Sequence, residues 1–256
     1  MKLDTILAVC SGDNYSQCVP YFLQTWKKAF PECCVYVIYI SDRLPSYLEA
    51  YHENIILVPF NPIYNSIPMD TIAKQMRVFM PSLWKNISRK RITGKIKDDD
   101  DEIVMMVNIN LLACNPSIFA NAVQPFENNM MIQLLDTNHP LYNPVFPICY
   151  TIASTSTWHE LLGISTWDDM YKSIQTDKNS TNLLRDIIMN WEPREKRIRI
   201  AGTGNIQFLR LGASKGDLDC TEKDMPLFAD AELKLPFSSY EFENKALFNK
   251  IMAYHV

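Results

Sequence analysis

The sequence predicts an α/β protein whose central sheet is mostly parallel and flanked by helices. Three observations predict this fold class. Short apolar runs, typical of strands that are buried on both faces, recur through the first half of the chain. Segments with apolar residues at helical spacing separate these runs, as in strand–helix–strand units. The sequence also contains no internal repeat and no low-complexity linker, which favours one continuous domain.

The predicted elements of the first half follow one another regularly. Residues 3–10 form a mostly apolar run and are expected to be the first strand. The next segment, residues 15–30, has helical spacing and is ended by Pro31. Further strands are expected at residues 35–40, 55–58 and 103–107, and further helices at residues 45–51 and 70–84.

The order of elements is looser in the second half. Helices are expected at residues 115–126, 150–162, 181–191 and 240–254, and strands at residues 130–135 and 197–200. We expect a single domain over residues 1–256. Its first half, residues 1–115, is of a nucleotide-binding type, and its more irregular second half, residues 116–256, shapes another pocket and ends in a C-terminal helix.

The composition is that of an ordinary globular chain, with 47% apolar and 21% charged residues, and it excludes disorder and fibrous repeats. A net charge of −4 shows no excess of positive charge of the kind with which proteins bind nucleic acid. No segment reaches the ~18 apolar residues of a membrane span, and the N-terminal run is too short for a signal peptide. The seven cysteines form no C-x-x-C pair and are expected to be reduced. These features indicate a cytoplasmic protein without a membrane span.

A run of five bases at residues 88–97 precedes the five acids Asp98, Asp99, Asp100, Asp101 and Glu102. One interpretation is a metal or phosphate patch. We favour a solvated loop, because adjacent unpaired acids repel one another and prefer water.

The loop after the first strand is a candidate ligand site, because sheets of this kind bind ligands beyond the carboxyl ends of their strands. It reads Ser11, Gly12, Asp13, Asn14, Tyr15 and contains no G-x-G-x-x-G, and no P-loop motif occurs in the chain. Asp13, Asn14 and Tyr15 can hold a base and ribose by hydrogen bonding and stacking. An ordinary strand-to-helix turn with a capping Asp or Asn is an equal alternative.

Three segments together resemble a known family. The fourth strand is followed by Asn108-Ile109-Asn110, an apolar pair and Asn115-Pro116. Residues 73–81 contain Arg77 and Pro81, and residues 229–236 read Ala-Asp-Ala-Glu-Leu-Lys-Leu-Pro. This layout resembles nucleotide-sugar glycosyltransferases of the GT-A type, in particular the small enzymes of chlorella-type large DNA viruses, which act on the glycan of the viral capsid protein. The likeness spans nearly the entire chain.

The resemblance implies a GT-A-like, Rossmann-like fold and a hexosyltransferase. Residues 1–115 would bind the nucleotide-sugar donor, and residues 116–256 the glycan acceptor. The donor would be UDP-linked, with UDP-L-rhamnose as one candidate, and a viral enzyme of this kind would work in the host cytoplasm. An inverting reaction is expected over a retaining one. A catalytically inactive module that binds a nucleotide or glycan is the alternative, and a structural protein without a ligand is a third hypothesis.

The sequence departs from the family at its metal site. The family's two Asp and one His, which hold manganese or magnesium, correspond here to Asn108, Asn110 and Glu232. Hard divalent cations favour carboxylate oxygens, so two amides and one acid form a poor site. We therefore expect no divalent metal cofactor, with the amides binding ribose hydroxyls or phosphate instead. A site that has lost its activity is the alternative interpretation.

Without a metal, cationic side chains must stabilise the departing diphosphate. Arg77 lies on the helix beside the site. Arg210, which follows the Gly202–Gly204 turn, is the first further candidate, and Lys234 is the second. For each of them, an ordinary surface base is the alternative.

Transfer to an acceptor hydroxyl also needs a base. Asp177 lies in Gln175-Thr176-Asp177-Lys178, which resembles the Thr-Asp-Gln/Glu stretch of related transferases, and it is the candidate. An ordinary helix-start acid is the alternative for Asp177, and Asp136 is the rival base. Trp158 is expected to stack on the acceptor sugar, and no role is assigned to the neighbouring His159.

Overall fold

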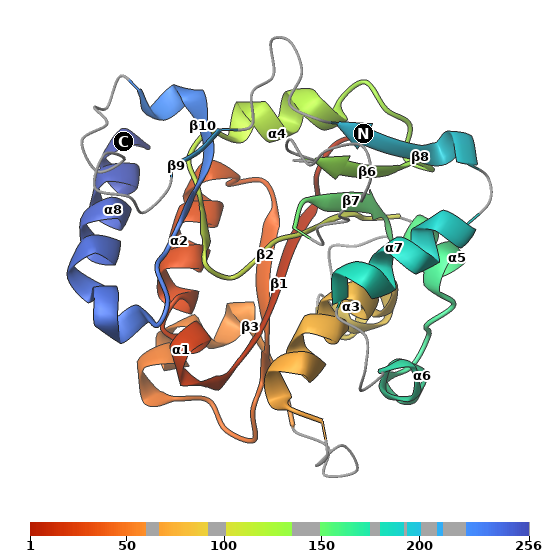
Figure 1. Ribbon diagram of the computed structural model, residues 1–256, viewed down its shortest axis with the longest axis horizontal. Coiled ribbons are helices and arrows are strands. Elements are labelled where there is room, and N and C mark those ends of the chain that lie inside the picture. Colours follow the sequence, from red (N-terminus) through yellow and green to blue (C-terminus); the bar gives the residue numbers. More distant parts are fainter. Residues whose placement is uncertain are drawn as a thin grey trace.

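The computed structural model describes residues 1–59, 67–91, 101–134, 149–174, 180–191, 194–200, 209–211 and 224–255. Seven strands of this described part form one sheet in the order β3-β2-β1-β4-β7-β6-β8 (Figure 1). Their bounds are Thr5–Ser11 for β1, Cys34–Ile40 for β2, Ile55–Val58 for β3, Ile103–Met106 for β4, Met131–Leu134 for β6, Thr151–Ser154 for β7 and Arg197–Ile200 for β8.

The large sheet is mostly parallel, as predicted. β1 pairs parallel with both β2 and β4, and β2 pairs parallel with β3. β7 runs antiparallel to its neighbours β4 and β6, and β6 is again parallel to β8. Among the described strands β7 alone is therefore reversed, at the place where the first and second halves of the chain meet in the sheet.

A second, smaller sheet joins distant parts of the chain. Its described strands lie in the order β5-β10-β9, with β5 at Leu111–Ala113, β9 at Leu209–Leu211 and β10 at Phe228–Glu232. β10 runs antiparallel to β5, with Glu232 opposite Leu111. The pairing brings residues near the C-terminus beside the segment that follows β4.

Helices cover the large sheet on both faces (Figure 1). The helices on one face pack into a core that includes Ile6, Ala8 and Cys10 of β1. The helices on the other face pack into a core that includes Leu7 and Val9 of β1. The first group is α2 (Val19–Ala29), α4 (Pro116–Val123) and α8 (Glu241–Tyr254). The second is α3 (Met69–Arg91), α5 (Thr155–Leu162), α6 (Trp167–Ser173) and α7 (Ser180–Asn190). The alternation along β1 follows from the period of two in a strand.

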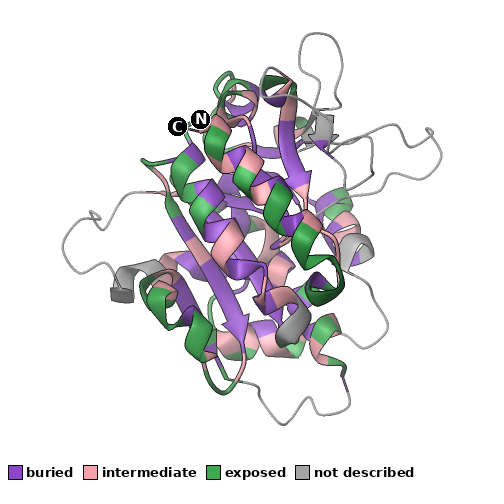
Figure 2. Cartoon of the chain, turned by 90° about the vertical axis from the view of Figure 1, so that its left-hand side faces the viewer, coloured by how far each residue is buried: buried purple, intermediate pink, exposed green. Residues whose placement is uncertain are grey.

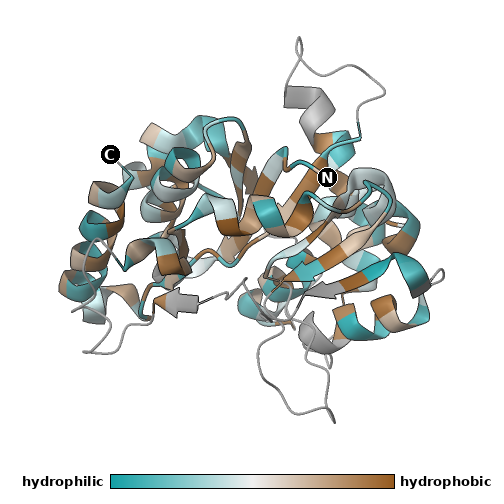
Figure 3. Cartoon of the chain, turned by 90° about the horizontal axis from the view of Figure 1, so that it is seen from above, coloured by the Kyte–Doolittle hydropathy of each residue, from teal (hydrophilic) through white to brown (hydrophobic). Residues whose placement is uncertain are grey.

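Short helical segments complete the described chain. They are α1 (Gly12–Ser16), η1 (Ser46–Asn54), η3 (Arg194–Lys196), η5 (Met225–Leu227) and η6 (Phe237–Tyr240). Figure 2 shows that the strands are drawn almost wholly in the buried colour, while exposed residues follow the outer sides of the helices. Figure 3 shows the same division in hydropathy, with hydrophobic residues gathered along the strands. None of the helices in the described part combines the length and apolar character needed to cross a bilayer.

Most predicted elements lie within a few residues of the observed ones, with one clear error. The helix predicted at residues 150–162 begins only at Thr155, because Thr151–Ser154 forms β7 between β4 and β6. The side chain of Ser154 then caps α5 by accepting a hydrogen bond from the Thr157 N–H. The prediction overlooked β5, β9, β10 and α6, which are short and lie beside loops.

Two acids of the charged run have structural partners. Glu102 accepts hydrogen bonds from Thr5 Oγ1 at 2.9 Å and from Trp84 Nε1 at 2.8 Å. Asp101 accepts one from the Ser156 N–H at 2.8 Å and so caps the first turn of α5. The expectation of a solvated loop is therefore wrong for these two residues, and residues 92–100 lie outside the described part.

The partners of Asp101 also change its ionisation. Burial alone raises the pKa of this carboxyl, but hydrogen bonds from Ser156, Thr155 and Ser154 outweigh burial and hold its pKa below the ordinary value. A carboxyl whose pKa is lower in the folded than in the unfolded state stabilises the fold at pH values above the unfolded pKa. This stabilisation is lost as the pH falls through the folded pKa.

Replacing Asp101 by Asn should lower the free energy of unfolding by about 1 kcal/mol at pH 7, because a charged cap of α5 is lost. The difference from wild type should shrink below about pH 4, where the unfolded carboxyl is protonated and the folded one follows. Denaturant titrations at both pH values measure it. Glu53→Gln, at an exposed position, is the control, and a difference independent of pH contradicts the argument.

Candidate functional site

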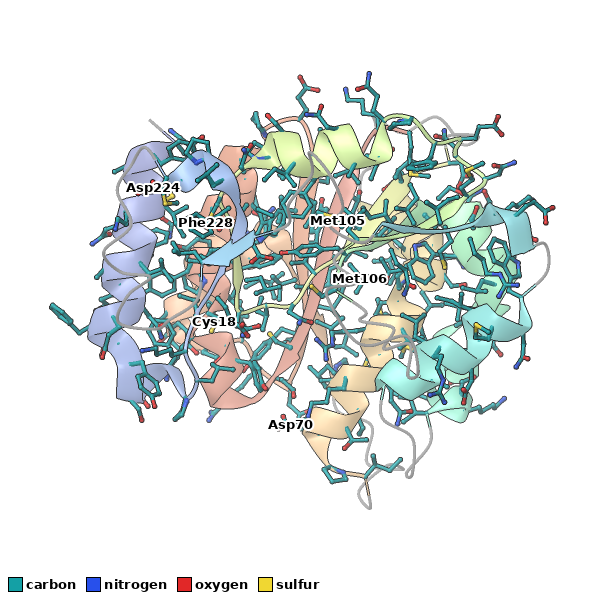
Figure 4. All side chains as sticks on the ribbon, turned by 45° about the horizontal axis from the view of Figure 1, so that its top comes forward. Cys18, Asp70, Met105, Met106, Asp224 and Phe228 are labelled. Atoms are coloured by element: carbon teal, nitrogen blue, oxygen red, sulfur yellow. The ribbon has the colours of Figure 1, made fainter. Side chains whose placement is uncertain are left out.

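A pocket of about 300 Å³ lies beyond the carboxyl ends of β1 and β4. α3 forms one wall, and its first turn carries Asp70, which is labelled in Figure 4. This is the edge at which open α/β sheets bind ligands. The polar lining residues are Ser11, Tyr15, Asp70, Lys74, Arg77, Asn108, Asn110 and Glu232.

Backbone hydrogen bonds hold the Asn108–Asn110 turn in the pocket. The Val107 N–H donates to the Leu7 carbonyl at 2.8 Å, so the chain stays in register with β1 up to the turn. Leu111 N–H donates to the Asn108 carbonyl at 3.1 Å and closes the turn. The Leu233 N–H donates to the Asn110 carbonyl at 2.8 Å, which ties the turn to the end of β10. The two Asn side chains therefore project from a fixed backbone.

The two amides face groups of opposite character. The Arg77 guanidinium donates to Asn108 Oδ1, and Asn110 Nδ2 donates to Glu232 Oε1 at 3.1 Å. Arginine can only donate and an ionised carboxylate can only accept, which fixes the orientation of both amides. Asn108 thus presents its oxygen to a cation, and Asn110 presents its nitrogen to an anion.

α3 supplies the positive charge of the pocket. Burial lowers the pKa of the Arg77 guanidinium from its ordinary value, yet an arginine of this kind stays protonated. Lys74 lies one turn before Arg77 and is exposed. Asp70, at the start of the same face, accepts a long hydrogen bond from Ser11 Oγ at 3.4 Å, which joins α3 to the end of β1. The lining therefore contains two cations and two carboxylates, the second being Glu232.

A buried bond supports β10 behind the pocket. Tyr150 donates its phenolic hydrogen to Asp230 Oδ2, and both side chains are fully buried. Tyr150 has φ of 60°, in the left-handed region that a bulky aromatic residue rarely adopts. Its backbone N–H donates to the Met106 carbonyl at 2.7 Å. These bonds connect the end of β4 with the strand that carries Glu232.

The described side chains of the lining form a poor site for a divalent cation of the kind used by the glycosyltransferases that the sequence resembles. The Asn108 oxygen, which would have to be a ligand, already accepts from the Arg77 guanidinium, and a second cation there would be repelled. Asn110 and Glu232 bind one another. Within the described residues, no group of three His, Cys, Asp or Glu side chains is placed to hold a metal ion.

The structure brings six of the predicted donor residues together in this pocket: Ser11, Tyr15, Arg77, Asn108, Asn110 and Glu232. Gly12 adjoins them with φ of 70°, where an added Cβ would meet nothing within 4 Å. Glycine is therefore needed there for its backbone conformation, not for lack of space.

Two residues that were predicted to contact a ligand lie elsewhere. The Lys234 ammonium lies 5.3 Å from the centroid of the Tyr240 ring and does not line the pocket. The prediction that Trp158 stacks on an acceptor is wrong, because its ring is fully buried in the core beneath α3 and α5. His159, given no role, has Nδ1 3.3 Å from the Ile164 carbonyl, a structural contact.

The remaining predicted residues fall in other parts of the chain. Asp177, its rival Asp136 and the Gly202–Gly204 turn lie outside the described residues, as do the side chains of Asp13, Asn14 and Arg210. The backbone of Arg210 belongs to β9 and lies opposite Asp230.

Sequence reasoning missed Asp70 and Lys74. With Ala73 and Arg77 they recur at positions i, i+3, i+4 and i+7 of α3, and all four line the pocket. This spacing marks one face of a helix. Once Arg77 had been chosen, the helical period alone could have identified the other two polar residues.

No family model and no curated protein matches the sequence. Among solved structures, the galactosyltransferase LgtC in complex with donor and acceptor sugar analogs matches 98% of this chain and 95% of its own, with a TM-score of 0.52 and 11% identity. The glycosyltransferase GlyE of Streptococcus pneumoniae TIGR4 matches 99% of this chain and 64% of its own, with a TM-score of 0.47 and 8% identity. A glycosyltransferase involved in glycosylation of the major capsid of PBCV-1 matches 95% and 99%, with a TM-score of 0.47 and 7% identity.

These likenesses concern the fold. Together with the mostly parallel sheet, the match to LgtC shows that the chain has the GT-A fold that the sequence predicts.

The double substitution Asn108→Asp with Asn110→Asp should create Mn²⁺ affinity, because two carboxylates would join Glu232 as hard oxygen ligands and the three negative charges would outweigh the single positive charge of Arg77. We expect a Kd of about 1 mM or below, against no binding at this site in wild type. Mn²⁺ titration followed by paramagnetic broadening measures it.

Adding Glu232→Gln to the double variant is the control and should weaken the new affinity. Equal Mn²⁺ binding by wild type and the double variant would contradict this account of the lining.

Proposed function

We propose that the protein is a glycosyltransferase that moves a sugar from a nucleotide-sugar donor to a glycan acceptor. One observation carries the proposal: the polar pocket of a GT-A fold contains two cations and a set of hydrogen-bonding side chains at the carboxyl ends of β1 and β4. A nucleoside diphosphate needs both kinds of group, cations for its phosphates and neutral or acidic groups for its ribose hydroxyls.

In this proposal each side of the pocket meets a different part of the donor. Arg77 and Lys74 bind the diphosphate, and Tyr15 packs on the base. Asn110 and Glu232, which are hydrogen-bonded to each other, accept hydrogen bonds from the ribose hydroxyls. We propose a UDP-linked donor, and the resemblance in sequence makes UDP-L-rhamnose the first hexose to test.

The reaction is proposed to proceed without a metal. As the bond from the sugar to the diphosphate breaks, negative charge grows on the leaving oxygen. Arg77 is already oriented by Asn108 and needs no reorganisation to stabilise this charge. Lys74, exposed one turn away, supplies a second cation.

An inverting transfer is proposed, with Asp177 as base. The carboxylate takes the proton of the acceptor hydroxyl while the hydroxyl oxygen attacks the anomeric carbon. One carbon–oxygen bond forms, the bond to the diphosphate breaks, and its electron pair leaves with the diphosphate. Asp70 is the second carboxylate to test, because it is exposed and lines the pocket.

A second candidate function is a binding module without transferase activity. The observation that favours it is the pair of amides at Asn108 and Asn110, in place of the two carboxylates expected at a metal-dependent site. Such a module would bind nucleotide in the same pocket and release no product.

Hydrolysis of a panel of nucleotide sugars should persist in EDTA, because Arg77 and Lys74 replace the metal. Arg77→Ala should lower kcat by about 100-fold, as expected for loss of one oriented charge in the transition state, and Lys74→Ala by about 10-fold. Lys172→Ala, at an exposed position of α6, is the control. Activity that EDTA abolishes and Mn²⁺ restores would overturn the metal-free reaction. Nucleotide binding without turnover would identify the binding module.

Asp177→Ala should lower the rate of transfer to an acceptor by at least about 100-fold with little change in the Kd for UDP, because a base acts on the acceptor. Asp70→Asn should change transfer by much less if Asp177 is the base. Initial transfer rates and calorimetric UDP titration separate the two carboxylates, and the opposite pattern would assign the base to Asp70.

A further inference from the structure

A second hollow, of about 620 Å³, opens on the side of the fold formed by α2, η1 and α8. It is lined by residues from helices that are far apart in the sequence, including Gln17, Tyr21, Tyr47, Phe237, Glu241 and Phe248. None of these residues lines the pocket at the ends of β1 and β4. The hollow is therefore a separate feature of the surface.

Aromatic rings form its floor. The Tyr21 and Phe237 rings lie 5.1 Å apart between centroids, and the Phe248 ring meets Tyr21 edge to face at 4.9 Å. Phe237 is buried, and Tyr21 and Phe248 pack against the same core. Because these rings are held by the core, they offer a rigid apolar surface that costs little entropy on binding.

One further aromatic residue, Tyr47, lines the hollow and faces solvent. Among the described residues, six large apolar side chains are exposed, and three of them are aromatic: Tyr47 at 48%, Tyr240 at 36% and Phe242 at 84%. Tyr47 lines the hollow, whereas Tyr240 and Phe242 do not. The exposed Tyr47 ring and the aromatic floor form one apolar surface, and such surfaces mark interaction sites.

The polar groups of the lining are mostly neutral. Gln17, Gln24 and Ser238 contribute two amides and a hydroxyl, which both donate and accept hydrogen bonds. Glu241 is paired with Lys245 four residues later on α8, so its charge is offset. A phosphate-bearing ligand would need cations here, whereas a sugar presents hydroxyls to amides and apolar C–H faces to rings.

The hollow shares two walls with the donor pocket. α1 carries Tyr15, which lines the donor pocket, and the turn that follows α1 carries Gln17, which lines the hollow. The segment after β10 carries Leu235 toward the donor pocket and Phe237 toward the hollow. The two cavities are therefore lined by neighbouring residues of the same short segments.

We propose that this hollow is a carbohydrate-binding subsite, which holds a part of the acceptor glycan remote from the hydroxyl that reacts. That the bound glycan is an acceptor rests on the proposed function. Tyr47 packs on the face of one sugar, and the amides of Gln17 and Gln24 bind its hydroxyls. The subsite raises the affinity for a long acceptor without taking part in the chemistry.

Tyr47 offers a matched pair of variants. Tyr47→Ala removes the exposed ring, whereas Tyr47→Phe keeps the ring and removes only the hydroxyl that bonds with Ser16 at 2.6 Å. An array of neutral oligosaccharides identifies a glycan that wild type binds, and calorimetry then gives its Kd for each variant. Tyr47→Ala should raise that Kd about 10-fold or more, while Tyr47→Phe should keep it within about 2-fold. Met189→Ala, at an exposed position of α7, should match wild type.

Several outcomes overturn the inference. They are absence of binding to every oligosaccharide, equal affinity of wild type and Tyr47→Ala, or equal loss in Tyr47→Ala and Tyr47→Phe. A dimer that Tyr47→Ala converts to monomer in sedimentation would instead show that the surface binds a second copy of the chain. Thermal melting of each variant excludes a loss that is due to unfolding.

The same measurements separate this inference from the proposed function. Hydrolysis of a nucleotide sugar without ring-dependent glycan binding would overturn the subsite alone. Ring-dependent glycan binding by a protein that neither binds nor hydrolyses any nucleotide sugar would overturn the proposed function and leave a carbohydrate-binding surface.

Discussion

The fully buried indole of Trp26 is the anchor on which the arrangement of both sheets depends. Its Nε1–H donates to the Leu111 carbonyl at 2.8 Å, which fixes β5 against α2. The ring stacks on Phe30 at 5.6 Å and packs on Phe119 and Tyr150. A buried indole needs a partner for its N–H, and here that partner is the first residue after the Asn108–Asn110 turn. The position of the pocket thus follows from core packing.

Around this anchor the pocket combines fixed and adjustable parts. The residue before Asn108 is bonded to the large sheet and Asn110 to the end of β10 in the small one, so the turn joins the two sheets. Tyr150 and Asp230 supply a second connection, in which the phenolic bond offsets an unfavourable backbone conformation of Tyr150. Lys74, by contrast, is exposed and free to change rotamer.

Hydrophobic periodicity predicted the elements that have a strong local signal. β1, β3 and β8 and the helices α7 and α8 begin and end close to the predicted residues, whereas α3 begins as predicted and continues to Arg91, beyond the predicted end at residue 84. The short strands β5 and β10 were missed because three to five residues carry no clear period, and their pairing is a long-range contact. Arg77 and Asn108 were predicted from their resemblance to a family pattern. The buried state of Trp158 depends on packing by α3, which no local pattern around residue 158 reveals.

In the proposed metal-free reaction, the Arg77 guanidinium has a consequence for turnover. A divalent ion can depart together with the diphosphate, and its supply in the cell then influences how fast the site empties. Arg77 is covalently part of α3 and always charged, so the positive end of the pocket cannot leave with the product. If nucleotide binds as proposed, ionic strength and competing anions, and not the concentration of free manganese, would set the rate at which the spent nucleotide is exchanged for a new donor.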